Sequence, residues 1–251
     1  MGDTGADRSL KGKLRRRLAK LSARREAPAG PSGPMISICF DDAPVSAVQA
    51  GARILESRGA RGTYFIAMGL AGQDGPMGPN ADAGQVKALL GAGHEIGCHT
   101  FSHLNCGMVP AGLVTGDVEL NCAALAQLGA PEAASFAWPY GEVSGPAKAA
   151  LGGRFALLRA LHHGVITGGS DLNQAPAVGI EGAGGEAMAR HWIHRAVRER
   201  AWLILYTHDV REKPSPFGCT PGALERLVDE AGAAGAEIVT VAEGCRRLGV
   251  L

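Results

Sequence analysis

From residue 35 onward, short apolar runs alternate with longer segments in which apolar residues recur every three or four positions. The apolar runs predict strands at residues 35–40, 62–67, 94–98, 134–138, 155–159, 178–181, 202–206 and 237–241. The amphipathic segments predict helices at residues 45–57, 82–92, 110–128, 185–200, 220–234 and 242–248. This alternation predicts an α/β fold with a parallel sheet, and the chain's size and strand number favour closure into a (β/α) barrel. An open doubly wound sheet is the alternative, although no Gly-x-Gly-x-x-Gly sequence follows the first strand.

Polar side chains follow the ends of four of these predicted strands. In chain order they are Asp41-Asp42, His99 and His103, Pro139-Tyr140-Gly141, and His208-Asp209. His99 and His103 lie four residues apart, which is about one helical turn, so their imidazoles can point the same way and form half of a divalent-metal site. In a parallel barrel the carboxyl ends of the strands converge on one face, where catalytic residues gather.

Composition and charge narrow the function classes. The chain has 251 residues, of which 46% are hydrophobic and 20% charged, and its net charge of +1 gives no global field that favours nucleic acid. No apolar run approaches the roughly 20 residues that span a membrane. The N-terminus lacks the apolar core of a signal peptide, so we expect a cytoplasmic protein. The six cysteines include no CxxC pair and are expected to be free thiols.

Residues 1–34 differ from the rest of the chain. They hold nine Lys or Arg and three acidic residues, a net charge of +6. One apolar stripe marks a predicted basic helix, and its members are Leu10, Leu14, Leu18 and Leu21. Residues 27–34, with three prolines and two glycines, predict a linker. We therefore divide the chain into a basic amphipathic arm at 1–34 and a barrel domain at 35–251, and expect a chain truncated near Pro34 to keep its barrel.

Three interpretations of the arm stay open. Residues 8–25 can make peripheral contact with an anionic membrane, since a basic amphipathic helix binds such a surface. The arm can equally be solvated, or it can pack on its own domain or on a partner subunit of a homo-oligomer.

Four motifs of this chain resemble those of the polysaccharide deacetylase family. They are Phe40-Asp41-Asp42, His99-Thr100-Phe101-Ser102-His103, Ala137-Trp138-Pro139-Tyr140-Gly141 and Tyr206-Thr207-His208-Asp209. The motifs occur in family order and extend from about residue 35 to the end of the chain. The resemblance implies a distorted (β/α)7–8 barrel and metal-dependent removal of acyl groups, usually N-acetyl, from sugars.

The resemblance also implies roles for the motif residues. Asp42, His99 and His103 would hold a divalent metal, with Zn²⁺ expected first and Ni²⁺, Co²⁺ or Mn²⁺ as alternatives. Two histidines and one carboxylate leave positions open for water and substrate, as a catalytic site requires. Asp41 would be the general base that takes a proton from the attacking water, and His208 the general acid that protonates the leaving amine.

The third and fourth motifs would border the substrate. The backbone N–H of Tyr140 would help to stabilise the tetrahedral oxyanion. Trp138, Pro139 and Tyr206 are the candidate substrate-binding residues: Trp138 can stack on a sugar face, and Tyr206 stands where the family usually has a Leu that lines the acetyl-methyl pocket.

The chain departs from the family pattern at two places. Many members begin the third motif with an Arg that pairs with the catalytic base, but Ala137 stands there, in an Ala-aromatic-Pro-Tyr-Gly motif that looks like a subfamily trait. The family's separate Asp that orients the acid histidine is not identified by spacing, and Asp171 and Asp209 are the candidates.

We therefore expect a metal-dependent deacetylase that acts on an N-acylated sugar. Because no export signal is found, the expected substrate is a nucleotide- or lipid-linked intermediate of glycan or lipopolysaccharide assembly, met in the cytoplasm or at the inner membrane surface. The alternatives are a non-catalytic glycan-binding or assembly member of the same fold, and a hydrolase of a non-sugar amide.

Overall fold

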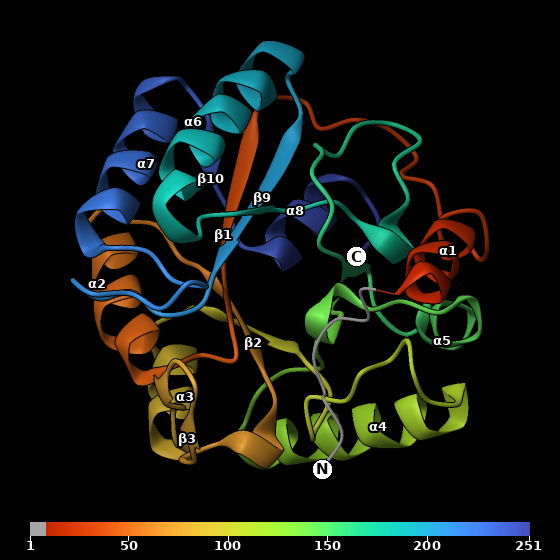
Figure 1. The fold of residues 1–251 in the computed structure, drawn as a ribbon. Coiled ribbons are helices and arrows are strands. Elements are labelled where there is room, and N and C mark those ends of the chain that lie inside the picture. Colours follow the sequence, from red (N-terminus) through yellow and green to blue (C-terminus); the bar gives the residue numbers. More distant parts are fainter. Residues whose placement is uncertain (1–8) are drawn as a thin grey trace.

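A curved sheet of parallel strands forms the centre of the molecule (Figure 1). The computed structural model describes residues 9–251. The strands of this sheet are β1 (Met35–Asp41), β2 (Thr63–Ile66), β5 (Glu95–Cys98), β6 (Ser135–Ala137), β7 (Leu157–Arg159), β8 (Val178–Gly179), β9 (Trp202–Thr207) and β10 (Glu237–Ile238). Their spatial order is β7-β6-β5-β2-β1-β9-β8, and β10 pairs with the first two residues of β1.

The sheet closes on itself through the segment that leads into β8. The N–H of Ala175 donates to the carbonyl of Leu158 at 2.9 Å, and its carbonyl accepts from the N–H of Ala160 at 2.8 Å, which joins this segment to β7. Three residues further on, β8 begins and pairs with β9 at the other end of the sheet. The result is a distorted parallel barrel, which confirms the predicted fold class.

Helices cover the outside of the barrel (Figure 1). They are α1 (Leu10–Ala19), α2 (Ala52–Glu56), α3 (Ala83–Gly91), α4 (Ala111–Gln127), α5 (Gly145–Leu151), α6 (Gly182–Glu199), α7 (Pro221–Ala233) and α8 (Val241–Arg247). Helices α2, α6 and α7 gather on one side, and α1, α4 and α5 lie on the other (Figure 1). Within residues 9–251, no helix is both long enough and apolar enough to cross a membrane.

Helix α8 covers the amino end of the barrel and so leaves the carboxyl end for the site. The N–H of Val241 donates to Oγ1 of Thr63, at the start of β2, at 2.9 Å. The N–H of Ala242 donates to Oε2 of Glu95, at the start of β5, at 2.7 Å. Both contacts lie at strand beginnings, because parallel strands all start at the same end.

The two-residue period of β1 aims Asp41 into the barrel. Ile36, Ile38 and Phe40 pack against the outer helices. Met35 and Cys39 belong to the cluster inside the barrel. Successive side chains of a strand point to opposite faces, so Asp41 continues the inward row at the carboxyl end.

Several elements differ from the sequence-based expectation. The helix predicted at 45–57 is a π-helical turn, Ala47–Gly51, followed by the short α2. The segment between β2 and α3, for which no strand was predicted, contains a small hairpin of β3 (Asp74–Gly75) and β4 (Gly78–Pro79). Helix α5 was not predicted, although Ser144 caps it and a proline stands in its first turn, both of which are helix-start signals. Three 3₁₀ turns complete the chain: Met68–Leu70, Pro139–Gly141 and Leu172–Gln174.

The predicted N-terminal helix is present as α1, and it packs on the barrel domain. Ala19 is buried, and its carbonyl accepts a hydrogen bond from Nζ of Lys148 in α5 at 2.9 Å. Arg15 Nη2 donates to Oε2 of Glu142 at 2.7 Å, and Arg16 pairs with the same carboxylate. The segment after α1 stays attached, because Arg25 donates to the carbonyl of Phe155 at 2.8 Å. The division at residue 34 remains a prediction.

Candidate metal and catalytic site

The carboxyl ends of β1 and β5 bring three candidate metal ligands together. Nε2 of His103 lies 3.3 Å, and Nε2 of His99 3.7 Å, from Oδ1 of Asp42. One ligand atom from each residue lies within 4.8 Å of the other two. Ligand bonds of about 2.0–2.2 Å place the donor atoms of a tetrahedral zinc ion about 3.4 Å apart. The spacing therefore suits a single divalent ion.

The protonation of these groups fits a cation as well. Burial and then the neighbouring His103 lower the pKa of His99 to about 4, so its imidazole is neutral at neutral pH. Its Nδ1 lies 2.8 Å from the carbonyl oxygen of Ala137, so Nδ1 donates there and Nε2 presents its lone pair toward Asp42. Oδ1 of Asp42 is buried and has no hydrogen-bond partner among the described residues. A divalent ion would satisfy both the lone pair and this carboxylate oxygen.

Backbone strain is concentrated at this site. Seven non-glycine residues of the described chain have positive φ. Five of them belong to the site or stand beside it: Asp42, Ala43, Thr100, His103 and Tyr140. Such conformations cost of order 1–3 kcal/mol each and persist where the surrounding structure holds them, often at functional sites. With these backbone conformations, the side chains of Asp42 and His103 point toward one another.

The two histidines lie on a loop rather than on the helical turn that their spacing suggested. Oδ2 of Asp117, in α4, accepts hydrogen bonds from the N–H groups of Phe101 at 2.8 Å and Ser102 at 3.0 Å. Oδ1 of the same carboxylate accepts from the hydroxyl of Ser102 at 2.9 Å. Helix α4 therefore anchors the loop midway between His99 and His103.

A buried ion pair fixes the charge of the predicted base. Asp41 is 3% exposed, and its Oδ2 accepts a hydrogen bond from Nη2 of the fully buried Arg159 at 2.6 Å. Burial alone would raise the pKa of Asp41, but the charges of Arg159, His99 and His208 and the hydrogen bond from Arg159 together outweigh burial, so the pKa lies below its usual value. Oδ1 has no hydrogen-bond partner among residues 9–251 and remains able to accept a proton.

Arg159 fills the place that Ala137 leaves open in the third motif. Ala137 on β6 and Arg159 on β7 are register partners, whose side chains point to the same face of the sheet. The guanidinium also lies over the rings of Phe65, at 5.2 Å, and Tyr206, at 4.9 Å. Sequence reasoning missed Arg159 because strand register is not visible along the chain; an arginine ending an apolar run was the available signal.

The predicted acid, His208, has a carboxylate partner. Its Nδ1 lies 3.2 Å from Oε1 of Glu181 and 3.2 Å from the carbonyl of Phe217. Burial would lower the pKa of His208, but Glu181 and the charges of Asp41 and Asp42 outweigh burial and raise the pKa to about 9. The imidazole is therefore protonated at neutral pH, as a general acid must be.

Neither aspartate suggested as the partner of His208 takes that role. Asp171 accepts a hydrogen bond from Nζ of Lys148 at 2.5 Å. Asp209 accepts from Oγ of Ser215 at 2.5 Å and from Nε of Arg211 at 2.6 Å. Glu181, which stands immediately before α6, was missed because it lies outside every motif and is a glutamate where an aspartate was sought.

The remaining motif residues are only partly accessible. The ring of Tyr140 contacts that of His103 edge to face, with centroids 4.4 Å apart. Trp138 is 1% exposed and packs on Phe136, so its burial contradicts the expected stacking on a sugar. Pro139 is buried as well. The hydroxyl of Tyr206 donates to Glu181 at 3.4 Å, which places this ring beside the acid histidine.

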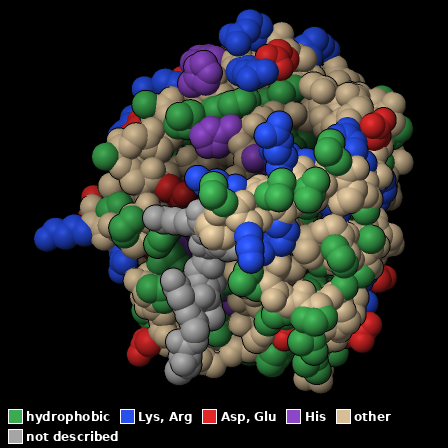
Figure 2. All heavy atoms as spheres, turned by 45° about the vertical axis from the view of Figure 1, so that its right-hand side comes forward, with side chains coloured by type: hydrophobic (Ala, Val, Ile, Leu, Met, Phe, Trp, Pro, Cys, Tyr) green, Lys and Arg blue, Asp and Glu red, His purple; other side chains and the backbone are tan. Residues whose placement is uncertain are grey.

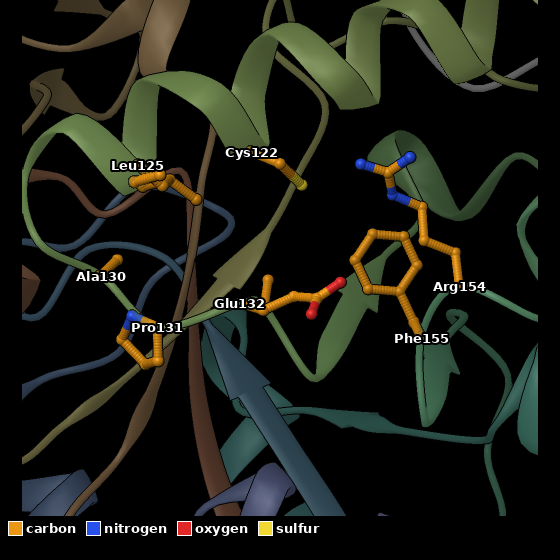
Figure 3. Close-up of a pocket in the computed structure, with 9 residues that line it drawn as sticks. Cys122, Leu125, Ala130, Pro131, Glu132, Arg154 and Phe155 are labelled. Atoms are coloured by element: carbon orange, nitrogen blue, oxygen red, sulfur yellow. The ribbon is translucent and has the colours of Figure 1, made fainter.

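A hollow of about 260 Å³ lies between the C-terminal half of α4 and the turns before β6 and β7 (Figure 3). Cys122, Glu132, Arg154 and Phe155 are among its lining residues. None of the predicted metal or catalytic residues lines it, so this hollow is separate from the candidate site.

Solved structures share the fold with this chain. The Xyl-CE4 domain of a multidomain xylanase from the hindgut metagenome of Trinervitermes trinervoides is 18% identical, with 87% of this chain and 92% of that chain covered and a TM-score of 0.63. The Bc1960 peptidoglycan N-acetylglucosamine deacetylase is 20% identical, with coverage of 86% and 90% and a TM-score of 0.59. A family 4 acetyl xylan esterase from Clostridium thermocellum, in complex with a cobalt ion, is 20% identical, with coverage of 83% and 89% and a TM-score of 0.56.

These neighbours define a class of barrels that includes carbohydrate deacetylases and esterases. Residues 29–152 match the family model described as polysaccharide deacetylase. This match to a polysaccharide deacetylase domain confirms the resemblance seen in the motifs. A search of curated proteins found no match. The subfamily assignment from the Ala-aromatic-Pro-Tyr-Gly motif remains a prediction.

Proposed function

We propose that this protein is a metal-dependent deacetylase that hydrolyses the N-acetyl, or another N-acyl, group of a sugar. The observation that carries the proposal is the Asp42, His99 and His103 cluster, accompanied by a base paired with Arg159 and an acid paired with Glu181. Asp42, His99 and His103 would hold the divalent ion, Zn²⁺ being our first expectation. When bound, this ion would supply Lewis acidity to the acyl carbonyl and the attacking water.

Asp41 starts the reaction as general base. Its Oδ1 accepts a proton from the attacking water while the water oxygen bonds to the acyl carbon. Arg159 keeps Asp41 ionised beforehand and holds Oδ2 by a hydrogen bond of 2.6 Å, so that Oδ1 is presented in one orientation. Tyr140, next to the site, would donate its backbone N–H to the oxyanion that forms.

His208 completes the reaction as general acid. Its Nε2–H is donated to the amide nitrogen as the carbon–nitrogen bond breaks, so the products are a carboxylate, acetate for an N-acetyl group, and a sugar amine. Glu181 and the carbonyl of Phe217 hold Nδ1 at 3.2 Å each, which turns the other nitrogen outward. Asp41 thus takes up one proton, from the water, and Glu181 supports the histidine that gives up another, to the leaving nitrogen.

The non-catalytic alternative loses its main support. The argument for a non-catalytic protein was that Ala137 replaces the Arg that many family members have in the third motif. Here Arg159 supplies a guanidinium to Asp41 from the adjacent strand. We retain the N-acylated sugar as the substrate because the fold is shared with enzymes named for carbohydrate substrates.

We further propose that the sugar is carried on a nucleotide or a lipid, as an intermediate of glycan or lipopolysaccharide assembly, and is met in the cytoplasm at the inner membrane surface. The support is α1 and the residue that follows it in the stripe: Leu10, Leu14, Leu18 and Leu21 are 83%, 57%, 56% and 75% exposed. Exposed leucines beside lysines and arginines match a surface of anionic lipid.

Acetate release tests the catalytic proposal. The zinc-loaded protein is incubated with N-acetylated sugars, nucleotide sugars, lipid-linked sugars and a non-sugar acetamide, and acetate is measured. Asp41→Asn should keep its zinc and lose on the order of 10²-fold or more in rate. Asp74→Asn, at an exposed position on the β3–β4 hairpin, is the matched control. Normal turnover by Asp41→Asn would reject the assigned base, and turnover of the acetamide alone would reject the sugar.

A further inference from the structure

A basic hollow lies between α1 and the segments that follow β6 and β7. Its volume is about 460 Å³, and four cationic side chains line it: Lys13, Arg16, Arg17 and Lys20. A second hollow of about 280 Å³ adjoins it and shares Lys20, His162 and Gln174. Figure 2 shows Lys and Arg side chains, together with histidines, around a hollow on this face.

The hollow shares a wall with the catalytic residues. Gly141 and Leu161 line it, and they approach so closely that a Cβ on Gly141 would lie 2.8 Å from Cβ of Leu161. Gly141 directly follows Tyr140, whose ring contacts His103. Leu161 stands two residues after Arg159, the partner of Asp41. A ligand that fills the hollow would therefore lie next to residues that are adjacent in the chain to those of the catalytic site.

The cations of the hollow have little counter-charge. Lys13, Arg17 and Lys20 are exposed, and no carboxylate of residues 9–251 forms an ion pair with any of them. Their spacing of four and three residues puts them on one helical face. No aspartate or glutamate is found among the residues that line this hollow. Arg16 differs, because it pairs with Glu142.

We propose that this hollow binds phosphate groups attached to the sugar substrate, so that the substrate class is a sugar phosphate or diphosphate ester. A phosphate brings the negative charge and acceptor oxygens that three unpaired cations lack. In a 2-acetamido sugar, the carbon that carries the amide is next to the anomeric carbon. A phosphate on the anomeric carbon would therefore lie directly beside the catalytic site, where the hollow is. A neutral polysaccharide would leave Lys13, Arg17 and Lys20 without counter-charge. The inference rests on the proposed function for its sugar.

The phosphate can belong to a nucleoside diphosphate sugar or to an isoprenoid lipid carrier, and both present the same ester to the hollow. Two substrates separate these sources: uridine diphosphate N-acetylglucosamine and farnesyl diphosphate N-acetylglucosamine. Whichever has the higher kcat/KM identifies the carrier, and in both cases the advantage over free N-acetylglucosamine should depend on the three cations.

Binding of inorganic pyrophosphate by the full chain tests the hollow without any turnover. We expect the triple variant Lys13→Ala/Arg17→Ala/Lys20→Ala to bind pyrophosphate about tenfold more weakly or worse in isothermal titration, since charge-assisted hydrogen bonds are lost. Wild-type binding should also weaken with salt. The control is Arg53→Ala/Lys87→Ala/Arg198→Ala, which removes three other exposed cations and makes the same change in net charge.

The outcomes separate this inference from the proposed function. The triple variant should keep its acetate release from a non-phosphorylated substrate while losing the preference for diphosphate esters. Equal pyrophosphate affinity of wild type and triple variant would overturn the inference and leave the deacetylase proposal standing. Loss of sedimentation with anionic liposomes at unchanged pyrophosphate affinity would also overturn it, because the cations would then serve a membrane surface. Absence of acetate release with intact pyrophosphate binding would instead overturn the proposed function.

Discussion

At the residue scale, two ion pairs shift the pKa values of the predicted base and the predicted acid in opposite directions. Arg159 keeps the pKa of Asp41 below its usual value, and Glu181 helps to raise that of His208 to about 9. A carboxylate that stays ionised and an imidazole that stays protonated can act together at neutral pH. When the environments of two titrating groups shift their pKa values apart in this way, the two groups can be assigned as the acid and the base of a site.

The first prediction concerns the displaced arginine. Arg159→Ala removes the charge that keeps Asp41 ionised, so the pKa of Asp41 rises and the acidic limb of the pH–rate profile moves to higher pH. We expect kcat/KM to fall by about 10²-fold. Because Ala137 is the register partner of Arg159, the double variant Ala137→Arg/Arg159→Ala should recover part of the loss.

Steady-state kinetics across pH, with thermal melting of each variant, checks this prediction. Arg159→Lys keeps a cation in place and should retain more activity than Arg159→Ala. If Arg159→Ala and Ala137→Arg/Arg159→Ala are equally inactive while both remain folded, a guanidinium supplied from position 137 cannot replace that of Arg159.

The second prediction concerns the partner of the acid. Glu181→Gln removes a carboxylate beside Nδ1 of His208, so the pKa of His208 falls. A general acid must be protonated, and its activity is lost as pH rises through its pKa. The alkaline limb of kcat/KM should therefore move to lower pH in this variant. Glu199→Gln, at the other end of α6, should leave the profile unchanged; an unshifted limb in Glu181→Gln would show that Glu181 does not tune His208.

Residues that follow strand ends could be found from the sequence, and residues that depend on strand pairing could not. Asp42, His99 and His103 were predicted together because parallel strands deliver their carboxyl ends to one face, and the structure places them within 4.8 Å. Arg159 and Glu181 act from elements whose neighbours are fixed only when the sheet forms. Trp138 was misjudged for the same reason, since its burial depends on packing against Phe136.

At the scale of elements, the site depends on how α4 holds the histidine loop. Asp117 is the contact between them, with two backbone N–H groups and one hydroxyl bonded to its carboxylate. The spacing of His99 and His103 suggested a helical turn, but Thr100 and His103 adopt positive φ instead. The same two residues converge by a different route, because the anchored loop replaces the helix.

The third prediction tests this anchor. Asp117→Ala leaves three donors of the loop without their acceptor and loosens the spacing of the two histidines. Loss of such an outer contact typically costs 10–100-fold in metal affinity, and we expect zinc affinity to fall by about that factor. Competition with a chelating dye measures it. Glu119→Ala, two residues away on the exposed side of α4, is the control; equal zinc affinity in all three proteins would contradict the role of Asp117.

At the scale of the whole molecule, the N-terminal segment from residue 9 onward packs on the barrel domain. Glu142 is buried and is paired with both Arg15 and Arg16. Lys148 is buried and donates to the carbonyl of Ala19. The prolines and glycines of residues 27–34 suggested a separable arm. Such a pattern indicates only the local stiffness of the chain, and long-range contacts cannot be predicted from it.

The fourth prediction follows from these contacts. A chain that lacks residues 1–34 leaves the buried carboxylate of Glu142 without its arginines, and breaking a buried pair from one side costs about 3–5 kcal/mol. We therefore expect a clear fall in Tm by thermal melting, against the sequence-based expectation of an intact barrel. A Tm equal to that of the full chain would show that the segment is dispensable.

A variant with serine in place of the exposed leucine stripe is the matched control, and the stripe consists of Leu10, Leu14, Leu18 and Leu21. Its Tm should stay near the wild-type value, since these side chains are exposed. If the stripe contacts lipid, sedimentation with anionic liposomes should fall in this variant. If it contacts a second copy of the chain, the oligomeric size should change instead.

The pairing of β1 with β9 has a consequence for synthesis on the ribosome. β1 ends at Asp41, and its partner β9 begins at Trp202. At about 5–20 residues per second, roughly 10 to 30 seconds pass between the two. During that interval one edge of an apolar strand has no neighbour to satisfy its backbone groups, and an open apolar edge invites pairing with other chains. The nascent chain is thus exposed to aggregation for most of its synthesis. Chaperones that cover the edge of β1 would therefore determine the fraction of chains that fold.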